Sequence, residues 1–234
     1  ILEFYRDLTE LSGFELETAG VLKGGRKLWA LARTGQSLTL RGKDVTHGYV
    51  LLATACDGSL ATTAQLTSVR VVCNNTLQVA LNAGNGKSGT GGVVKVKHNT
   101  VFDAKAVKQQ LGIEVSDWAL FKDHLEALST RKVSHTEAHR YITAVFSDPY
   151  GPIDRPPVNE KAMNRALELF NGQGMGSMLD SSKGTAYGLL NAITQYVDHE
   201  RRARSTDNRL DSAWFGQGAV IKQKALDNAL AMLG

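Results

Sequence analysis

The sequence has no long apolar run and no targeting segment. A membrane-spanning helix needs about 20 consecutive, mostly apolar residues, and no stretch of the 234-residue chain approaches that length. The first ten residues contain no basic segment followed by an apolar one, which a secretory signal requires. We therefore expect a cytoplasmic protein that neither crosses a membrane nor is secreted.

Cysteine is scarce, with only Cys56 and Cys73. Each ends an apolar run of a predicted strand, which favours a buried free thiol over a disulfide or a metal ligand. A reducing compartment fits this pattern. We expect no structural metal and no cofactor.

Proline is also rare, and all four prolines lie within residues 148–158. Proline interrupts both helices and central strands, so this segment is the clearest linker. The expected organisation has four parts. They are a basic strand-rich region at 1–102, a helical region packed on it at 103–147, the Pro-rich linker at 148–158, and a C-terminal helical region at 159–234.

Acidic residues are nearly absent between Gly20 and Phe102. That segment has ten Lys or Arg and two acids, Asp44 and Asp57, which gives it a charge of +8. The other 151 residues have 17 Lys or Arg and 21 Asp or Glu, which gives −4. Positive charge concentrated on one segment suits a polyanion, and counterion release makes nucleic acid the natural partner. The composition thus predicts a class of ligand but no reaction.

The first 102 residues have the alternating pattern of strands. We expect a hairpin around Lys23-Gly24-Gly25 and a second one around Asp57-Gly58. A short helix capped by Asn74 or Asn75 should follow, and then another strand. The expected elements are a helix at 1–11, strands at 14–22, 26–33, 49–56 and 61–73, a helix at 74–82, and a strand at 92–100.

From Asp103 onward the apolar period changes to 3.6, which predicts helices. We expect them near 103–111, 116–130, 134–147, 159–171, 185–204 and 218–232. Strands followed by helices favour an α+β fold. The predicted fold is an antiparallel sheet with hairpins and a short helix in the first half, followed by a mostly helical second half.

Two short motifs suggest chemistry that their context does not support. The Gly-Lys-Ser within 83–92 is not a nucleotide-binding loop, because Leu81 stands where that motif needs a glycine. The loop is either a plain linker or a segment that contacts a backbone phosphate.

His135 and His139 are one helical turn apart, but Thr136 replaces the glutamate of a zincin site. Ser134 is the expected cap of that helix.

Candidates for nucleic-acid contact are cations of three segments and two aromatic residues. Trp29 shares a predicted strand face with Lys27, and Tyr187 lies in the predicted helix at 185–204. Such rings stack on bases beside a cationic track, although with only 7% aromatic residues most rings should be core. For the arginines that crowd the C-terminal end of that helix, interaction with the helix dipole is an equally good interpretation. The predicted phosphate contacts are Lys23, Arg26, Lys27, Arg41 and Lys43 at the hairpin end, Lys95 and Lys97 on the later strand, and Arg201, Arg202 and Arg204 on the helix at 185–204.

Four segments together resemble the phage/plasmid-like proteins of domain-of-unknown-function family 932. They are 22–33, 49–59, VRVVCNNTL at 69–77, and 184–219, of which the last two are the most specific. The resemblance implies a bacterial cytoplasm and a mobile element but no established reaction, so it transfers no site residue. A more distant analogy, at the level of fold only, is with Rad52-type and phage annealing proteins, which form rings or filaments.

These features predict a nucleic-acid-binding protein of a phage or plasmid that binds or anneals single-stranded DNA in recombination or replication. We expect a homo-oligomer without catalytic residues. Two alternatives stay open. One is a metal-dependent nuclease that uses Asp198, Glu200, Asp207 or Asp211 with a divalent cation, and the other is a module that binds an acidic protein.

Overall fold

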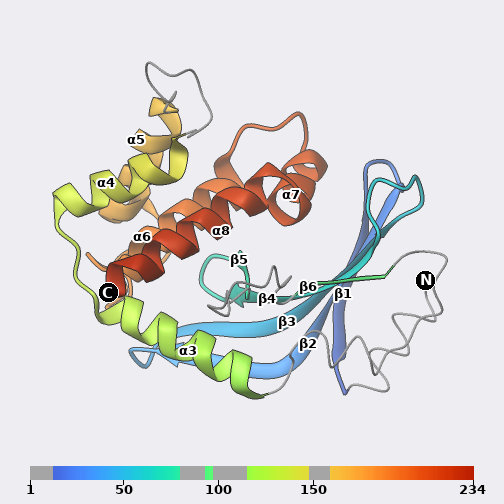
Figure 1. The fold of residues 1–234 in the computed structure, drawn as a ribbon, viewed down its shortest axis with the longest axis horizontal. Helices are drawn as coiled ribbons and strands as arrows, with labels where there is room; N and C mark the ends of the chain where they lie inside the picture. Colours follow the sequence, from blue (N-terminus) through green and yellow to red (C-terminus); the bar gives the residue numbers. More distant parts are fainter. Residues whose placement is uncertain (1–12, 80–92, 97–114, 148–158) are drawn as a thin grey trace. The chain divides into compact units, whose positions relative to one another are not determined.

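The computed structural model describes residues 13–79, 93–96, 115–147 and 159–234 (Figure 1). The chain divides into two compact units. The first comprises Ile1–Leu38, Thr46–Val69 and Thr76–Lys122, and the second comprises Thr39–Val45, Arg70–Asn75 and Asp123–Gly234. The predicted linker at 148–158 and the predicted helices at 1–11 and 103–111 lie outside the described residues.

The strands form one six-stranded sheet. In chain order they are β1 (Glu15–Leu22), β2 (Lys27–Leu40), β3 (Asp44–Ala55), β4 (Thr62–Arg70), β5 (Asn75–Gln78) and β6 (Val93–Val96). Neighbours follow chain order from β1 to β5, and β6 pairs antiparallel with β4. The antiparallel sheet predicted for the first half is confirmed.

The first hairpin has the predicted turn. Lys23, Gly24 and Gly25 all have positive φ, at 55°, 64° and 88°. Glycine adopts this backbone region without steric cost, so the two glycines let the chain reverse within a few residues. Leu22 and Lys27 then face each other as the first pair of the β1–β2 ladder.

The helix predicted at 74–82 is wrong over its described part, which begins with strand β5. The amide of Val79 donates to the carbonyl of Leu66 at 3.0 Å, and the hydroxyl of Thr67 donates to the carbonyl of Leu77 at 3.1 Å. Asn75 caps no helix, because it is the first residue of strand β5. Its Nδ2 donates to Oγ1 of Thr194 at 3.0 Å. Pairing with β4 has overridden the local capping signal.

The described part of the second half is helical, as predicted. Its elements are α3 (Val115–Thr130), α4 (His135–Phe146), α5 (Glu160–Glu168), the π-helical turn η1 (Leu169–Gln173), α6 (Ala186–Gln195), the π-helical turn η2 (Tyr196–Glu200), α7 (Thr206–Phe215), α8 (Gln217–Leu230) and the 3-10 turn η3 (Ala231–Leu233). Helix α7 was not predicted. Its signal is Ser205, whose Oγ accepts from the amide of Asn208 at 3.1 Å, as an N-cap does.

Helix α6 is central to the second unit. Leu189 and Ile193 are fully buried, and nine of its ten residues are buried. Helices α4 and α8 are tied together by the hydroxyl of Tyr141, which donates to the carbonyl of Ala225 at 2.8 Å. Burial raises the pKa of Tyr141, so this hydroxyl keeps its proton.

The start of α4 carries a reciprocal cap. Oγ of Ser134 accepts from the amide of Glu137 at 3.3 Å, and the Glu137 carboxylate accepts from the amide of Ser134 at 2.8 Å. Hydrogen bonds from Arg131 and then from Ser134 lower the pKa of Glu137 from 4.5 to about 2. The predicted cap residue is confirmed.

Glu137 should make a pH-dependent contribution to stability. Because its folded pKa is depressed, the contribution is fully present above pH 4.5 and is lost as the pH falls through about 2. We expect Glu137→Gln to be less stable than the native chain at pH 6, with the difference shrinking between pH 4.5 and pH 2. Urea unfolding at several pH values measures this, and a difference that does not change with pH would contradict it.

Candidate functional site

Four candidate cations of the first unit lie at the same end of the sheet. The amide of Cys56 donates to the carbonyl of Arg26 at 2.8 Å, which brings the β1–β2 turn beside the β3–β4 turn (Figure 1). The hydroxyls of Thr54 and Thr62 are 3.0 Å apart, so the start of β4 lies at this end too. Lys95 of β6 pairs with Thr63. The ladder thus places Lys23, Arg26, Lys27 and Lys95 together.

The spacing of this group is set by the strands. From β2 to β6 there are three strand-to-strand steps, which amount to about 14 Å. Arg26 and Lys95 are exposed, whereas Lys23 and Lys27 are partly exposed. An acid of this end, Asp57, has its pKa lowered chiefly by hydrogen bonds from Ser59 and to a smaller extent by the charge of Arg26.

Trp29 lies against a glycine on the neighbouring strand. Gly20 faces Trp29 in the β1–β2 register, and a Cβ on Gly20 would be 2.8 Å from Cζ2 of the indole. Only a residue without a side chain leaves room for the ring in this position. Trp29 is partly exposed, as are Lys27 and Leu31 of the same strand face. On the other face Ala30 and Ala32 are buried and Leu28 is partly exposed.

Two cations of the basic segment are held by acids. Nε of Arg33 is 3.0 Å from Oε2 of Glu17, and Nη2 of Arg33 donates to the hydroxyl of Tyr49 at 3.3 Å. Arg70 is paired with Asp44. The candidate Lys97 lies outside the described residues, as does Lys87 of the Gly-Lys-Ser segment.

The second unit contains a buried ionic centre formed by Arg70 and Asp44. Nε and Nη2 of Arg70 donate to the two carboxylate oxygens of Asp44 at 2.8 and 2.5 Å. Their side chains are only 3% and 1% exposed. Desolvation lowers the pKa of Arg70, but the Asp44 hydrogen bonds and nearby charges raise it more, so the net pKa is raised. The guanidinium is therefore permanently charged.

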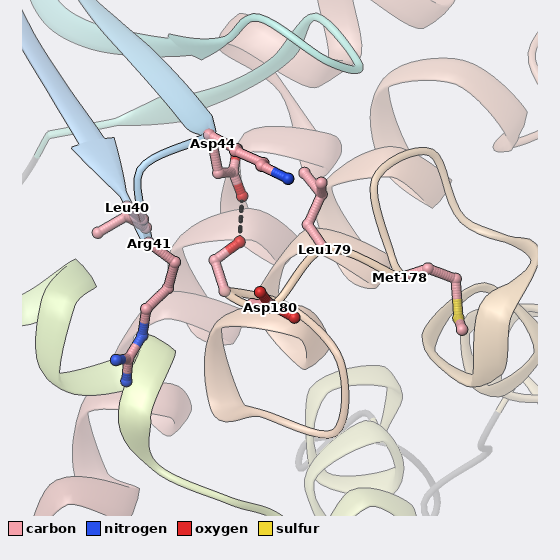
Figure 2. Close-up of a pocket in the computed structure, with 8 residues that line it drawn as sticks. Leu40, Arg41, Asp44, Met178, Leu179 and Asp180 are labelled. Carbon is pink, nitrogen blue, oxygen red and sulfur yellow. Dashed lines mark hydrogen bonds between the residues drawn. The ribbon is translucent and has the colours of Figure 1, made fainter.

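Polar groups from the loop before α6 complete this centre. Oγ of Ser181 donates to Asp44 at 2.5 Å (Figure 2), and Oγ of Ser182 accepts from Arg70 at 2.8 Å. The ring of Tyr187 lies 5.2 Å from the guanidinium carbon of Arg70. Tyr187 is only 3% exposed, which corrects its proposed role as a stacking surface for a base.

A small pocket lies beside the Asp44–Ser181 hydrogen bond (Figure 2). Its volume is about 130 Å³, and its lining residues are Leu40, Arg41, Lys43, Asp44, Met178, Leu179, Asp180 and Ser181. Arg41 and Lys43 are exposed residues of the β2–β3 turn, and Arg41 extends away from Asp44. Because Arg70 balances the charge of Asp44, the two cations outnumber the remaining acid, Asp180.

The three C-terminal arginines of the candidate set follow η2 and are not part of a helix. The π-helical turn ends at Glu200, and α7 begins at Thr206. Arg201 is partly buried, and its Nη1 donates to Oγ of Ser212 at 2.8 Å. Arg202 and Arg204 are exposed. Arg201 therefore has a structural contact that its two neighbours do not share.

Two of the four carboxylates considered for a nuclease are engaged by cations. Oδ1 of Asp198 accepts from Nζ of Lys222 at 2.7 Å, and both side chains are almost fully buried. Glu200 accepts two hydrogen bonds from Arg165, at 2.5 and 3.1 Å. Over the part of the chain that the structure describes, no three His, Cys, Asp or Glu residues are placed to hold a metal ion.

Sequence reasoning missed the Arg70–Asp44 centre because it counted Arg70 with the surface cations. The available signal was the position of Arg70 within the apolar run SVRVVC, since an arginine buried in such a run needs an acidic partner. The prediction for Cys56 was also wrong. Its thiol is exposed, while that of Cys73 is buried and has a raised pKa, chiefly through desolvation.

No described helix has the length and apolar character needed to cross a membrane. Comparison with curated proteins found no match, and comparison with solved structures found none either. Residues 1–214 match a protein family described as "Domain of unknown function (DUF932)". Since this match covers most of the chain and agrees with the resemblance of the four sequence segments, the protein belongs to the DUF932 family.

Proposed function

We propose that the protein binds nucleic acid, single-stranded DNA in particular, and acts in recombination or replication of a phage or plasmid. One observation carries the proposal: Lys23, Arg26, Lys27 and Lys95 lie at one end of the sheet, near the ring of Trp29. A cationic track beside an aromatic ring holds phosphates and bases at the same time. Proteins without sequence preference bind single strands in this way.

Trp29 supports the preference for single strands. A base that stacks on an aromatic ring contributes about 1–3 kcal/mol, and it must leave the duplex stack to do so. The indole lies against Gly20 and is partly exposed. A ring in this setting has few alternative positions, so it loses little conformational entropy when a base binds.

The second unit supplies further cations for phosphate contact. Arg41 and Lys43 line the small pocket, and Arg202 and Arg204 are exposed between η2 and α7. Phosphate contacts position the nucleic acid without reading its sequence. The proposed ligand is therefore a strand of unrestricted sequence, which is what an annealing protein needs.

We also propose that the protein is a cytoplasmic homo-oligomer. Annealing requires two strands to be held together, and two copies each holding one strand supply this. The nucleic acid of a bacterial mobile element lies in the cytoplasm. No catalytic residue and no cofactor are part of the proposal.

Neutralising the cations at the sheet end should flatten the salt dependence of binding. The variant is Arg26→Gln, Lys27→Gln and Lys95→Gln together. Three lost phosphate contacts should reduce the slope of log affinity against log salt by about 2, because each contact to a single strand contributes about 0.7. Fluorescence anisotropy with single-stranded and duplex oligonucleotides over a range of salt concentrations measures both the slope and the preference.

A matched variant removes the same net charge elsewhere. Arg140, Lys161 and Lys183 are exposed, and changing all three to Gln should leave the slope nearly unchanged. If both triple variants change the slope equally, the sheet end is not the binding site. If the native chain binds duplex more tightly than single strands, the proposed strand preference is wrong.

A further inference from the structure

Strand β1 forms an edge of the sheet and offers an exposed backbone. It pairs with β2 on one side, and among the described residues no strand lies on its other side. The side chains of Leu16 and Val21 are 52% and 56% exposed, and every residue from Glu15 to Ala19 is exposed. The strand has eight residues and no proline. Such an edge is able to accept a further strand.

One face of β1 carries an apolar stripe. Residues paired across an antiparallel ladder lie on the same face of the sheet. Leu16, Ala19 and Val21 pair in turn with Ala32, Ala30 and Leu28, which alternate along β2. A bulge at Glu17 keeps the side chain of Leu16 on the same face of the sheet as the side chains of Ala19 and Val21. An exposed edge strand in water therefore presents three apolar side chains in a row.

The charges of β1 are segregated along its length. Glu15 and Glu17 lie at its start, and Lys23 and Arg26 lie in the turn just after its end. Thr18 to Leu22 carry no charge. A strand of the same sequence would bring opposite charges together if it added antiparallel, and like charges together if it added parallel.

We infer that the occupant of this edge is β1 of a second copy, added antiparallel about a two-fold axis near Ala19. With the bulge counted as one ladder position, Leu16 then faces the partner's Val21, so the two apolar stripes meet on one face. Glu15 faces the partner's Leu22, next to its Lys23, and the reciprocal contacts follow by symmetry. The inference rests on the assembly part of the proposed function and not on nucleic-acid binding. The two ladders become one continuous sheet across the dimer.

The bulge and the two glutamates of β1 oppose its pairing with another strand, because bulges and charges are common ways to protect an exposed sheet edge. Both lie in its first half, so in the antiparallel arrangement neither meets its own copy across the axis. Two short strands bury much less than the area of about 1,600 Å² that is typical of a stable complex. The contact is consequently a weak one that a larger assembly or a shared ligand would reinforce.

Mixing two charge-reversed variants tests the geometry without nucleic acid. Glu15→Lys alone and Lys23→Glu alone each place like charges together twice in the dimer, and each should raise the dimer dissociation constant about tenfold. An equal mixture of the two should recover native-like association, because each mixed dimer has two opposite-charge contacts. Sedimentation velocity over a concentration series measures this, and a mixture that associates no better than its components would overturn the proposal.

Cross-linking gives a second, independent readout. In a Cys56→Ser background, Ala19→Cys should form a disulfide-linked dimer under mild oxidation, because the axis brings the two thiols together. Val220→Cys on α8 is the control, since Val220 is 58% exposed, much like Val21. Equal cross-linking of the two variants would overturn the proposal. Loss of nucleic-acid binding by the sheet-end variant, with cross-linking retained, would show that assembly and binding are separate.

Discussion

Replacing Arg70 with alanine should lower the free energy of unfolding by about 3–5 kcal/mol, the usual cost of leaving a buried charge without its partner. The carboxylate of Asp44 is 1% exposed and, among the described residues, would keep the hydrogen bond from Ser181 alone. Oγ of Ser182 and the carbonyl of Gly176 would also lose the donor that they share, Nη2 of Arg70. Urea unfolding followed by far-ultraviolet circular dichroism measures the loss.

The matched control is Arg33→Ala. Arg33 and Glu17 form an ion pair of similar length, 3.0 Å, but their side chains are 42% and 44% exposed. Water screens such a pair, so the expected loss is much smaller than that of Arg70→Ala. Equal losses for Arg33→Ala and Arg70→Ala would contradict the argument from burial. Adding Asp44→Ala to Arg70→Ala should cost less than the sum of the two single changes, because residues in one network are coupled.

The Arg70–Asp44 centre fixes the parts of the second unit that carry candidate phosphate contacts. Asp44 follows the turn that bears Arg41 and Lys43, and Arg70 begins the segment 70–75. Both segments are tied by these hydrogen bonds to the loop before α6. The pocket beside Asp44 therefore keeps its form only while the centre is intact.

The sequence was sufficient for elements whose signals are local. The hairpin at Lys23-Gly24-Gly25 was predicted because glycines at a strand end specify a turn. Helix α4 was predicted because its apolar residues recur at the helical period and Ser134 is a suitable cap. The helix periods predicted most of the second half in the same way. These signals depend on residues a few positions apart, which a single sequence displays directly.

Elements that depend on distant partners were not predictable in this way. The segment that begins at Asn75 resembles a capped helix, but its partner strand β4 decides its conformation. The ion pair of Arg70 joins residues 26 positions apart, and the hydrogen bond of Ser181 to Asp44 spans 137 positions. Counting charges along the chain therefore placed Arg70 on the surface.

In the candidate site too, features set by neighbouring residues were predictable and features set by distant partners were not. Lys23, Arg26 and Lys27 lie together because they share one turn, but Arg41 and Lys43, predicted at the same hairpin end, lie in the β2–β3 turn instead. Lys95 joins the first three only through the pairing of β6 with β4, which no local pattern specifies. Tyr187 was misjudged because its helix is buried on nearly all sides, which depends on packing partners distant in sequence.

Gly188→Ala should lower the free energy of unfolding by about 3 kcal/mol, the upper end for overpacking of a filled site. A Cβ at this position of α6 would overlap with the backbone carbonyl oxygen of Ser182, which cannot rotate away. In an exposed helix the same change would stabilise the protein, because alanine favours helix over glycine by about 1 kcal/mol. A loss of stability on Gly188→Ala, and not a gain, would therefore indicate that the loop at Ser182 lies in close contact with α6.

The local hydrogen bonds explain why that approach is fixed. Oγ1 of Thr185 accepts from the amide of Gly188 at 3.0 Å and lies 2.7 Å from the carbonyl oxygen of Ser181. This wraps the loop over the first turn of α6. Gly184→Ala is the control, because its Cβ would meet nothing within 4 Å and only its φ of +64° opposes the change, at about 1–2 kcal/mol.

Because the hydroxyl of Ser182 accepts from Arg70, displacement of Ser182 by Gly188→Ala should also weaken the ionic centre. The combination of Gly188→Ala with Arg70→Ala is then expected to cost less than the sum of the two, by at least about 0.5 kcal/mol. Urea unfolding of the two single variants and the double variant measures this coupling. Strict additivity would mean that the loop yields to the new methyl group without disturbing Arg70.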